Sequence, residues 1–169
     1  MTLREAELHD ARGIAEVHVR SWRAAYVGIV PAAELARLSV DEREKLSTQF
    51  LSKEERSTSV LVNQDLVVGW AGFGPPRDED CDPALVAEVY GLYLLPEYWG
   101  LGLGQQLYGV IETRMRRNPV ESLVLWVFDK NTRARRFYEA CGYQLETGKQ
   151  DEMPFVEARV QIVRYRKIL

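Results

Sequence analysis

The chain has 169 residues with a net charge of −3, and 46% of its residues are hydrophobic and 28% charged. This length suits one globular domain, so we take residues 1–169 as a single domain. The acidic balance argues against a dedicated nucleic-acid-binding protein, which normally carries a basic excess, and no apolar run approaches the roughly 20 residues of a membrane span.

The N-terminal third predicts one short strand followed by helices. Residues 2–7 alternate in the manner of a strand, and Asp10 stands where it can cap the segment that follows. That segment is a predicted helix that ends before Gly28, and its apolar face carries Ile14, Val17 and Trp22.

Two further helices are predicted before the first long strand. Pro31 begins a short one, and the run Asp41-Glu42-Arg43-Glu44 resembles the capping box of the next. We expect that later helix to bury its apolar residues in the core, namely Leu46, Phe50 and Leu51.

The middle of the chain predicts a hairpin and a further strand. Residues 60–62 and 66–73 are rich in β-branched and aromatic residues, and the polar turn between them leaves its turn type open. A polar, acidic loop over residues 75–83 follows. Residues 84–95 form the next predicted strand, which stops before Pro96.

The chain is organised around the run Tyr98-Trp99-Gly100-Leu101-Gly102-Leu103-Gly104, between this strand and a helix. The helix is marked by apolar residues at helical spacing, Leu103, Leu107, Val110, Ile111 and Met115. Glycines let backbone N–H groups turn outward and the helix dipole favours negative charge, so the run predicts a phosphate site. The alternative is a tight turn without a ligand. Gln105 and Gln106 stand where a nucleotide-binding P-loop needs Lys.

The C-terminal half predicts a second strand and helix and an alternating tail. Asn118 and Pro119 end the preceding helix, and Ser122–Phe128 is apolar on both faces, as a buried parallel strand requires. Asn131 is placed to cap a helix that Gly142 ends, and residues 156–162 alternate like a strand. These elements together predict a mixed α/β fold.

The chain contains two cysteines and two histidines, the residue types that most often form disulfides or bind metals. Cys81 and Cys141 make no disulfide framework, and the N-terminal residues contain no apolar signal segment, so we expect free thiols and a cytoplasmic protein. His9 and His18 have no cysteine or carboxylate at ligand spacing, and we therefore expect no metal site.

Two blocks of the chain resemble the GNAT acetyltransferase superfamily. Residues 87–104 resemble its acetyl-CoA motif, whose core Gln/Arg-x-x-Gly-x-Gly/Ala aligns with residues 99–104, and residues 131–143 resemble a second block at the expected distance. The resemblance spans roughly residues 2–166 and is strongest from 87 to 143. It implies a central, mostly antiparallel mixed sheet with a splayed parallel strand pair in the middle, flanked by helices.

The resemblance implies acetyl-CoA as the co-substrate. The diphosphate cradle is then the loop of Trp99, Gly100, Leu101, Gly102, Leu103 and Gly104. Backbone groups of Leu92, Tyr93 and Leu94 hold the acetyl and pantetheine groups, while Asn131 and Arg135 are the further cofactor contacts that we expect.

The chain departs from the family pattern at two positions of this loop. Trp99 stands where the family has Gln or Arg, and Leu101 where a basic residue is frequent, so we expect weakened but not absent affinity. A basic cluster can compensate at the 3′-phosphate, or can be a solvated helix face; it comprises Arg114, Arg116, Arg117, Arg133, Arg135 and Arg136.

Acetyl transfer to an amine needs a base for the ammonium and an acid for the leaving thiolate. Glu88 aligns with the catalytic glutamate of well-studied family members, and strand parity places it on one side of the strand with Leu92 and Leu94. The alternatives are a surface carboxylate here and ordered water as the base. Tyr138 aligns with the tyrosine that the family uses as general acid, the alternative being a core aromatic residue beside Phe137.

Aromatic residues are the candidates for the acceptor site. His18, Trp22 and Tyr26 fall in the helical region where the family builds its substrate mouth, and each can equally be a core residue. Tyr90 and Tyr93 are also candidates and are expected on opposite faces of their strand. Aromatic rings beside an acidic residue would suit a cationic amine, and the acidic candidates are Glu34, Glu88 and Glu97.

These residues predict an N-acetyltransferase that transfers the acetyl group of acetyl-CoA to a primary amine by direct attack on the thioester. The alternative is a CoA-binding regulatory or structural module with little or no turnover, which Trp99 and Leu101 favour. The acceptor stays open between a small-molecule amine and a peptide or protein amine, with neither nucleic acid nor membrane as partner. A homodimer is common in the family, and the oligomeric state stays open.

Overall fold

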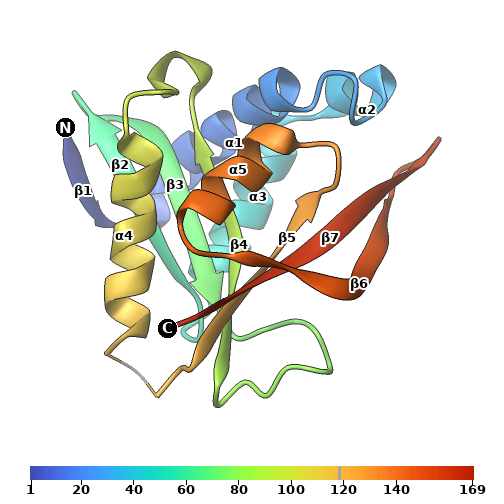
Figure 1. The fold of residues 1–169 in the computed structure, drawn as a ribbon. Coiled ribbons are helices and arrows are strands. Elements are labelled where there is room, and N and C mark those ends of the chain that lie inside the picture. Colours follow the sequence, from blue (N-terminus) through green and yellow to red (C-terminus); the bar gives the residue numbers. More distant parts are fainter. Residues whose placement is uncertain (118) are drawn as a thin grey trace.

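The computed structural model describes residues 1–117 and 119–169, and its strands join one sheet (Figure 1). The seven strands follow the order β1-β2-β3-β4-β5-β7-β6. They are β1 Thr2–Glu5, β2 Ser57–Asn63, β3 Leu66–Gly74, β4 Val86–Leu94, β5 Ser122–Phe128, β6 Gln144–Pro154 and β7 Arg159–Ile168. The helices are α1 Ala11–Ala25, α2 Ala32–Arg37, α3 Val40–Leu51, α4 Leu103–Met115 and α5 Thr132–Ala140, with short 3-10 turns at Leu8–Asp10 and Pro96–Tyr98.

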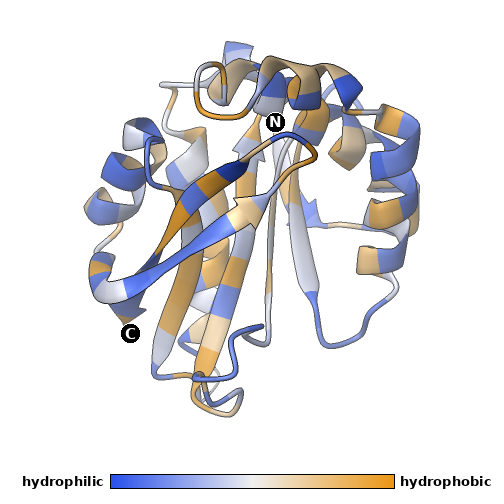
Figure 2. Cartoon of the chain, turned by 90° about the vertical axis from the view of Figure 1, so that its right-hand side faces the viewer, coloured by the Kyte–Doolittle hydropathy of each residue, from blue (hydrophilic) through white to orange (hydrophobic). Residues whose placement is uncertain are grey.

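The sheet is mostly antiparallel, and the parallel pair of β4 and β5 lies in its middle, which confirms the predicted fold class. Helices α1 and α3 cover one face of the sheet, and α4 and α5 lie on the other (Figure 1). The central strands are largely hydrophobic, whereas the β6–β7 hairpin at the edge is more hydrophilic (Figure 2). Among the described residues no helix is both long and apolar enough to cross a membrane.

The sheet and α4 enclose the main hydrophobic core. Leu107 and Ile111, which recur at helical spacing on α4, are fully buried together with the strand residues Phe73, Leu123 and Leu125. Burying each such side chain contributes about 1.5–3 kcal/mol. This packing determines where α4 begins and therefore where the glycine loop ahead of it lies.

Asp10 does not cap α1 as the sequence predicts. Its carboxylate accepts hydrogen bonds from the Glu7 amide at 2.8 Å and from the Arg4 guanidinium at 2.6 Å. The reason is the 3-10 turn that precedes α1, because Asp10 closes this turn and ties it to β1 through Arg4.

Helix α3 also departs from its prediction. Ser39 rather than Asp41 caps it, since the Ser39 hydroxyl accepts a hydrogen bond from the Glu42 amide at 3.4 Å. No residue of α3 is fully buried, so the expected core role is wrong for Leu46, Phe50 and Leu51. The apolar side of α3 therefore covers the sheet without closing tightly on it.

Strand β4 contains a bulge. Gly72 of β3 lies opposite Gly91, but the next residue of β3, Phe73, lies opposite Val89. Tyr90 is therefore an extra residue in β4. An extra residue reverses the alternation of side chains along a strand, because that alternation has a period of two.

The bulge overturns two predictions about β4. Glu88 does not share a side with Leu92 and Leu94: those leucines face α4, whereas Glu88 lies on the face that α1 and α3 cover. Tyr90 and Tyr93 do not lie on opposite faces either. The Tyr90 ring contacts Phe50 of α3, and the Tyr93 ring contacts His18 of α1.

Strands β4 and β5 separate after a short paired stretch. Parallel pairing joins Val86, Ala87 and Glu88 to residues 122–124 and then stops. Beyond this stretch β4 is paired only with β3, and β5 only with β7. The backbone of residues 89–94 therefore borders an opening in the sheet, which confirms the predicted splay.

The C-terminal half follows its local signals closely. Asn131 caps α5 by accepting a hydrogen bond from the Ala134 amide at 3.2 Å, and Gly142, with φ of 91°, follows the helix end as predicted. The predicted stop at Asn118 lies outside the described residues, and α4 ends at Met115. Residues 155–158 form the turn between β6 and β7, so the predicted strand over residues 156–162 is wrong for its first three residues, and β7 begins only at Arg159.

An aromatic layer fills the space between α1 and the sheet. The His18 ring lies 5.0 Å from Trp22, 6.0 Å from Trp70 and 5.1 Å from Tyr93, measured between ring centroids. Burial, and then the charge of Arg43, lower the pKa of His18 to about 3. The folded protein therefore keeps this imidazole neutral.

We expect the free energy of unfolding to fall at acidic pH because of His18. The unfolded chain protonates this ring near pH 6.5, whereas the folded protein resists protonation until about pH 3, so stability present above pH 6.5 is lost as the pH falls. The expected loss is at most about 1.4 kcal/mol per pH unit. His18→Phe keeps a ring and should flatten this dependence in urea unfolding at a series of pH values. The control is His9→Asn, and a His18→Phe protein with the wild-type pH dependence would contradict the prediction.

Candidate functional site

Three tyrosines meet at the opening between β4 and β5. Tyr26 follows α1, Tyr93 lies near the end of β4, and Tyr138 lies on α5. The Tyr26 ring packs on Phe128 at the end of β5, with 4.8 Å between ring centroids. Burial, and then the neighbouring hydroxyls of Tyr93 and Tyr138, raise the pKa of Tyr26 well above its usual value. Residues from both strands and both layers of helices therefore converge at this point.

Tyr138 is suited to donate a proton. Burial, and then the neighbouring Tyr93, raise the pKa of Tyr138, so its hydroxyl is protonated at neutral pH. In the described part of the chain this hydroxyl has no hydrogen-bond partner. Tyr108 and Tyr143 also lack partners, but their hydroxyls are completely buried. Of these three tyrosines, Tyr138 alone presents an accessible proton.

The glycine loop presents a row of free backbone amides. Gly100 and Gly102 both have φ of 75°, which side chains other than glycine rarely adopt, and a Cβ at either position would meet nothing within 4 Å. Within residues 1–117 and 119–169 no acceptor lies on the N–H groups of residues 100–104, and the amides of Gln105 and Gln106 bond back to Gly102. An open row of amides at the N-terminus of α4 fits a phosphate group.

Trp99 brings an arginine to this loop. The Trp99 indole donates a hydrogen bond to the Leu94 carbonyl at 2.8 Å, and the Arg133 guanidinium lies 3.5 Å from the centroid of the Trp99 ring. No acidic partner of Arg133 lies among the residues described, and burial lowers its pKa. Trp99 replaces the Gln or Arg of the family. The loop therefore still has a cation beside it, which is Arg133 of α5.

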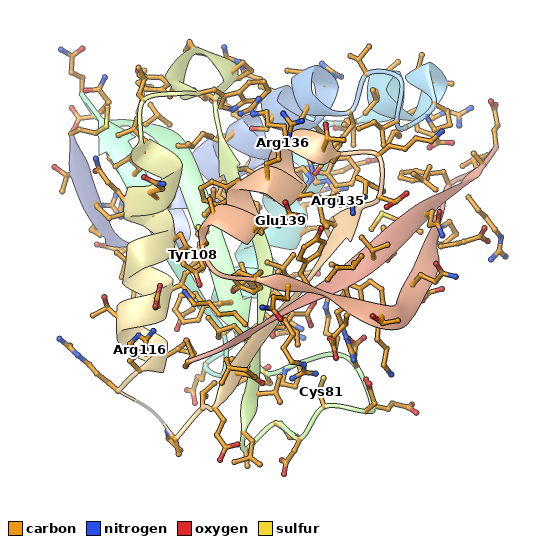
Figure 3. The ribbon with its side chains drawn as sticks, viewed as in Figure 1. Cys81, Tyr108, Arg116, Arg135, Arg136 and Glu139 are labelled. Atoms are coloured by element: carbon orange, nitrogen blue, oxygen red, sulfur yellow. The ribbon has the colours of Figure 1, made fainter. Side chains whose placement is uncertain are left out.

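Asn131 and Arg135, which the sequence predicts as cofactor contacts, have other partners. The Asn131 side chain caps α5. Arg135 donates hydrogen bonds to the Asp129 carboxylate at 2.7 Å and to the Tyr165 hydroxyl at 2.9 Å, and Tyr165 donates to Glu139. Figure 3 shows Arg135, Arg136 and Glu139 along α5. The sequence named Arg133 only as one of a cluster, because the stacking on Trp99 is not local.

Two more arginines of the basic cluster, both near the end of α4, form ion pairs with acidic residues. Arg116 donates to Glu112 one helical turn earlier, at 2.6 Å (Figure 3 labels Arg116). Arg114 pairs with Glu5 of β1. These pairs lie on the exposed side of the helix, so the prediction of a solvated helix face fits this part of the cluster.

Glu88 is completely buried at the base of the opening. Its carboxylate accepts hydrogen bonds from the Arg77 backbone amide at 2.9 Å and from Arg77 Nε at 3.1 Å. The Arg77 side chain is 58% exposed and also covers the Tyr90 ring at 5.2 Å. Arg77 therefore stands between Glu88 and solvent. It lies in the loop that precedes β4, 11 residues before Glu88, and no sequence pattern indicated this pairing.

The expected acceptor residues divide into two groups. Trp22 and Tyr26 are buried, with 4.9 Å between their ring centroids, and pack with Phe128. Tyr90 is partly exposed, and its hydroxyl donates to the Pro75 carbonyl. Each acidic candidate for a cationic amine pairs with an arginine, Glu34 with Arg37, Glu88 with Arg77 and Glu97 with Arg20.

One acidic cluster lies outside this region. Asp78, Asp80 and Cys81 bring their ligand atoms within 4.8 Å of one another in the loop before β4, where Figure 3 labels Cys81. The buried Arg164 side chain donates to Asp78 at 2.9 Å and to Asp80 at 2.7 Å. Arg164 therefore neutralises the carboxylates and ties this loop to β7.

The chain is similar to known acetyltransferases in sequence and in fold. The model of the Acetyltransferase (GNAT) family matches residues 17–143. An uncharacterised N-acetyltransferase of Bacillus subtilis, YuaI, is 31% identical over 96% of this chain and 90% of its own length. The crystal structure of PaiA N-acetyltransferase from Thermoplasma acidophilum with coenzyme A superposes with a TM-score of 0.74 at 19% identity, covering 99% of this chain and 98% of that one.

A ribosomal-protein-alanine N-acetyltransferase from Brucella melitensis has the same fold, with a TM-score of 0.75 at 17% identity over the full length of both chains. The residues that the family model covers include β4, the glycine loop and Tyr138. The sheet, the splayed strand pair and the open amides lie where the sequence motifs predicted them. The chain therefore belongs to the GNAT family of acetyltransferases.

Proposed function

We propose that the protein transfers the acetyl group of acetyl-CoA to a primary amine by direct attack of the amine on the thioester. The observation that carries this proposal is the opening between β4 and β5, which adjoins both the Tyr138 hydroxyl and the free amides of residues 100–104. As a member of the GNAT family the chain is an N-acetyltransferase that uses acetyl-CoA. The comparisons lend no support to a CoA-binding module without turnover.

The residues present fit acetyl-CoA, which supplies the activated thioester. The amides of residues 100–104 suit a diphosphate, and Arg133 suits a phosphate oxygen beside them. The backbone of Leu92–Leu94 lacks a strand partner on the β5 side, so it suits the amides of the pantetheine arm, as an added strand would. An N–H group there also stabilises negative charge on the acetyl oxygen.

Two side chains handle protons in this proposal. Tyr138 donates its hydroxyl proton to the sulfur of the leaving thiolate, for which its raised pKa keeps it protonated. Glu88 accepts the proton of the acceptor ammonium, directly or through water. Its place on the face of β4 that also carries Tyr93 supports this role, and its ion-pair partner Arg77 lies between the carboxylate and solvent.

The acceptor is an amine, and its identity is the open part of the proposal. A small-molecule amine and a peptide or protein amine are both candidates, and one structural relative is named for the alanine of a ribosomal protein. Cys81 and Cys141 are free thiols, which supports a reducing, cytoplasmic compartment. A homodimer is the assembly that we propose to test, by light scattering.

An amine panel monitored by release of free CoA thiol tests the function directly. The panel contains amino acids, polyamines, aminoglycosides and N-terminal peptides, each with acetyl-CoA. Thiol release that depends on one amine class supports the proposal. A thermal shift with CoA without thiol release from any amine would instead support the binding module.

Tyr138→Phe should lower kcat by about 100-fold or more while leaving the affinity for acetyl-CoA unchanged, because a positioned acid contributes roughly 10²–10⁴-fold. The measurement is steady-state thiol release, with thermal melting to verify folding. Tyr143→Phe removes a neighbouring buried hydroxyl and is the matched control, with activity near wild type. Equal activity of both variants would exclude Tyr138 as the acid.

Arg133→Gln should weaken binding of CoA by about tenfold or more, since a well-made charge-assisted hydrogen bond contributes about 1.5–3 kcal/mol. Calorimetry with CoA and dephospho-CoA measures this loss, and an equal loss for both ligands assigns Arg133 to the diphosphate. Arg136→Gln on the same helix is the comparison. Similar losses in both variants would indicate diffuse attraction by the cluster rather than a specific role for Arg133.

Glu88→Gln should lower kcat at neutral pH by about 100-fold and spare acetyl-CoA affinity if Glu88 is the base. Arg77→Gln removes its partner and should change the pH dependence of kcat. A structural ion pair gives a different pattern, in which both variants unfold at lower urea concentration and kcat stays near wild type. That pattern would remove Glu88 from the mechanism.

A further inference from the structure

A cavity of about 130 Å³ lies between α1, α3 and the β-sheet. This is room for roughly four water molecules at about 30 Å³ each. Its apolar wall includes the α3 residues that the sequence assigned to the core, Leu46, Phe50 and Leu51. Its polar members come from several elements, and they include His18, Arg43, Trp70 and Tyr90. The apolar side of α3 therefore borders a space, although its Phe50 ring also contacts Tyr90 of β4.

Arg43 is a cation without a counterion in this cavity. Its guanidinium is half-buried and lies 5.5 Å from the centroid of the Trp22 ring. Of the acids near it on α3, Asp41 and Glu44 bind Arg12 of α1 at 2.6 Å and 2.9 Å, and the exposed Glu42 attracts Arg43 without forming an ion pair with it. Over residues 1–117 and 119–169, Arg43 has no ion pair and its side chain makes no hydrogen bond. Leaving a desolvated cation unpaired costs free energy, which an anionic ligand would recover.

Polar atoms beside Arg43 are also unsatisfied. The indole Nε1 of Trp22, the indole Nε1 of Trp70 and His18 Nε2 are buried and have no hydrogen-bond partner. An indole nitrogen can only donate. Arg43 and the unsatisfied indole N–H group of Trp70 both line the cavity, so they match a ligand that offers several acceptor oxygens, as a carboxylate does.

Tyr93 links this cavity to the acetyl-transfer site. Its ring lies 5.1 Å from both His18 and Trp70, and its hydroxyl interacts electrostatically with Arg43 and with Tyr138. A molecule in the cavity is therefore one side chain away from the opening where the thioester is expected.

We propose that this cavity binds a carboxylate-type oxyanion carried by the acceptor amine itself, so that the enzyme acetylates amino acids or similar amino-carboxylates rather than polyamines. Arg43 holds the anion, the indole N–H group of Trp70 donates to it, and the amine extends toward Tyr93. That the occupant is the acceptor amine rests on the proposed function. That the occupant is negatively charged is inferred from the cavity alone.

Binding of simple anions tests the charge of the site without acetyl-CoA. The probes are benzoate with its neutral isostere benzamide, and isobutyrate with isobutyramide, followed by the tryptophan fluorescence of the full-length protein. We expect saturable quenching by the carboxylates that is at least about tenfold tighter than by the amides. No saturable binding, or equal binding of anion and amide, would overturn the proposal.

Two variants of α3 localise the effect. Arg43→Gln should weaken carboxylate binding about tenfold or more, to the level of the amides. Lys45→Gln removes the same charge from an exposed position two residues away and should bind as wild type. A wild-type affinity in Arg43→Gln would contradict the assignment, while equal losses in both variants would show only a general field effect. Thermal melting of Arg43→Gln verifies that it is folded.

Acetyl transfer tests whether the occupant is the acceptor. The matched pairs are L-methionine with 3-(methylthio)propylamine and L-leucine with isoamylamine, and spermidine represents the polyamines. We expect kcat/KM to favour the carboxylate member at least about tenfold, and Arg43→Gln to reduce that ratio. Preference for spermidine or for the decarboxylated amines would overturn the acceptor assignment. The anion titration needs no CoA. A protein that does not transfer acetyl groups can therefore be distinguished from a protein whose cavity does not bind anions.

Discussion

The separation of β4 from β5 is the constraint on which the rest of the site depends. Both strands keep one antiparallel neighbour, β3 or β7, so each stays extended although their inner edges are unpaired. Unpaired backbone groups bordering a space are costly unless something satisfies them. Tyr26, which follows α1, packs on Phe128 at the end of β5 and borders the opening there. The sheet is thereby stable and still offers peptide groups to an extended ligand.

Two arginines stacked on tryptophans are found on opposite sides of this opening. Arg133 lies over Trp99 beside the glycine loop, and Arg43 lies over Trp22 beside the α3 cavity. A ring face attracts a cation only modestly, by about 0.5–2 kcal/mol, so stacking holds each guanidinium in place without satisfying its N–H groups. Both arginines therefore remain available to an anion, one on the side of the diphosphate and one on the side of the acceptor.

The sequence predicted those parts of the molecule whose conformation is determined by residues close to them in the chain. The glycine loop requires the left-handed conformation at Gly100 and Gly102. Asn131 caps α5, the helix that begins at the next residue. Ser122–Phe128 is a strand because its residues are apolar throughout. The contacts that define the site join distant segments, such as Arg133 with Trp99, and their residue types carry no signal of which partner each will meet.

The bulge at Tyr90 shows how one residue alters an argument about function. Alternation along β4 predicted that Glu88 shares a side with Leu92, but the extra residue reverses the alternation between them. Glu88 instead lies on the face of β4 from which Tyr90 lines the α3 cavity. That face carries the cavity that we propose for the acceptor, whereas the leucines support α4 and the glycine loop. In the proposed mechanism the proton acceptor therefore lies on the side from which the amine arrives, and the bulge is what places it there.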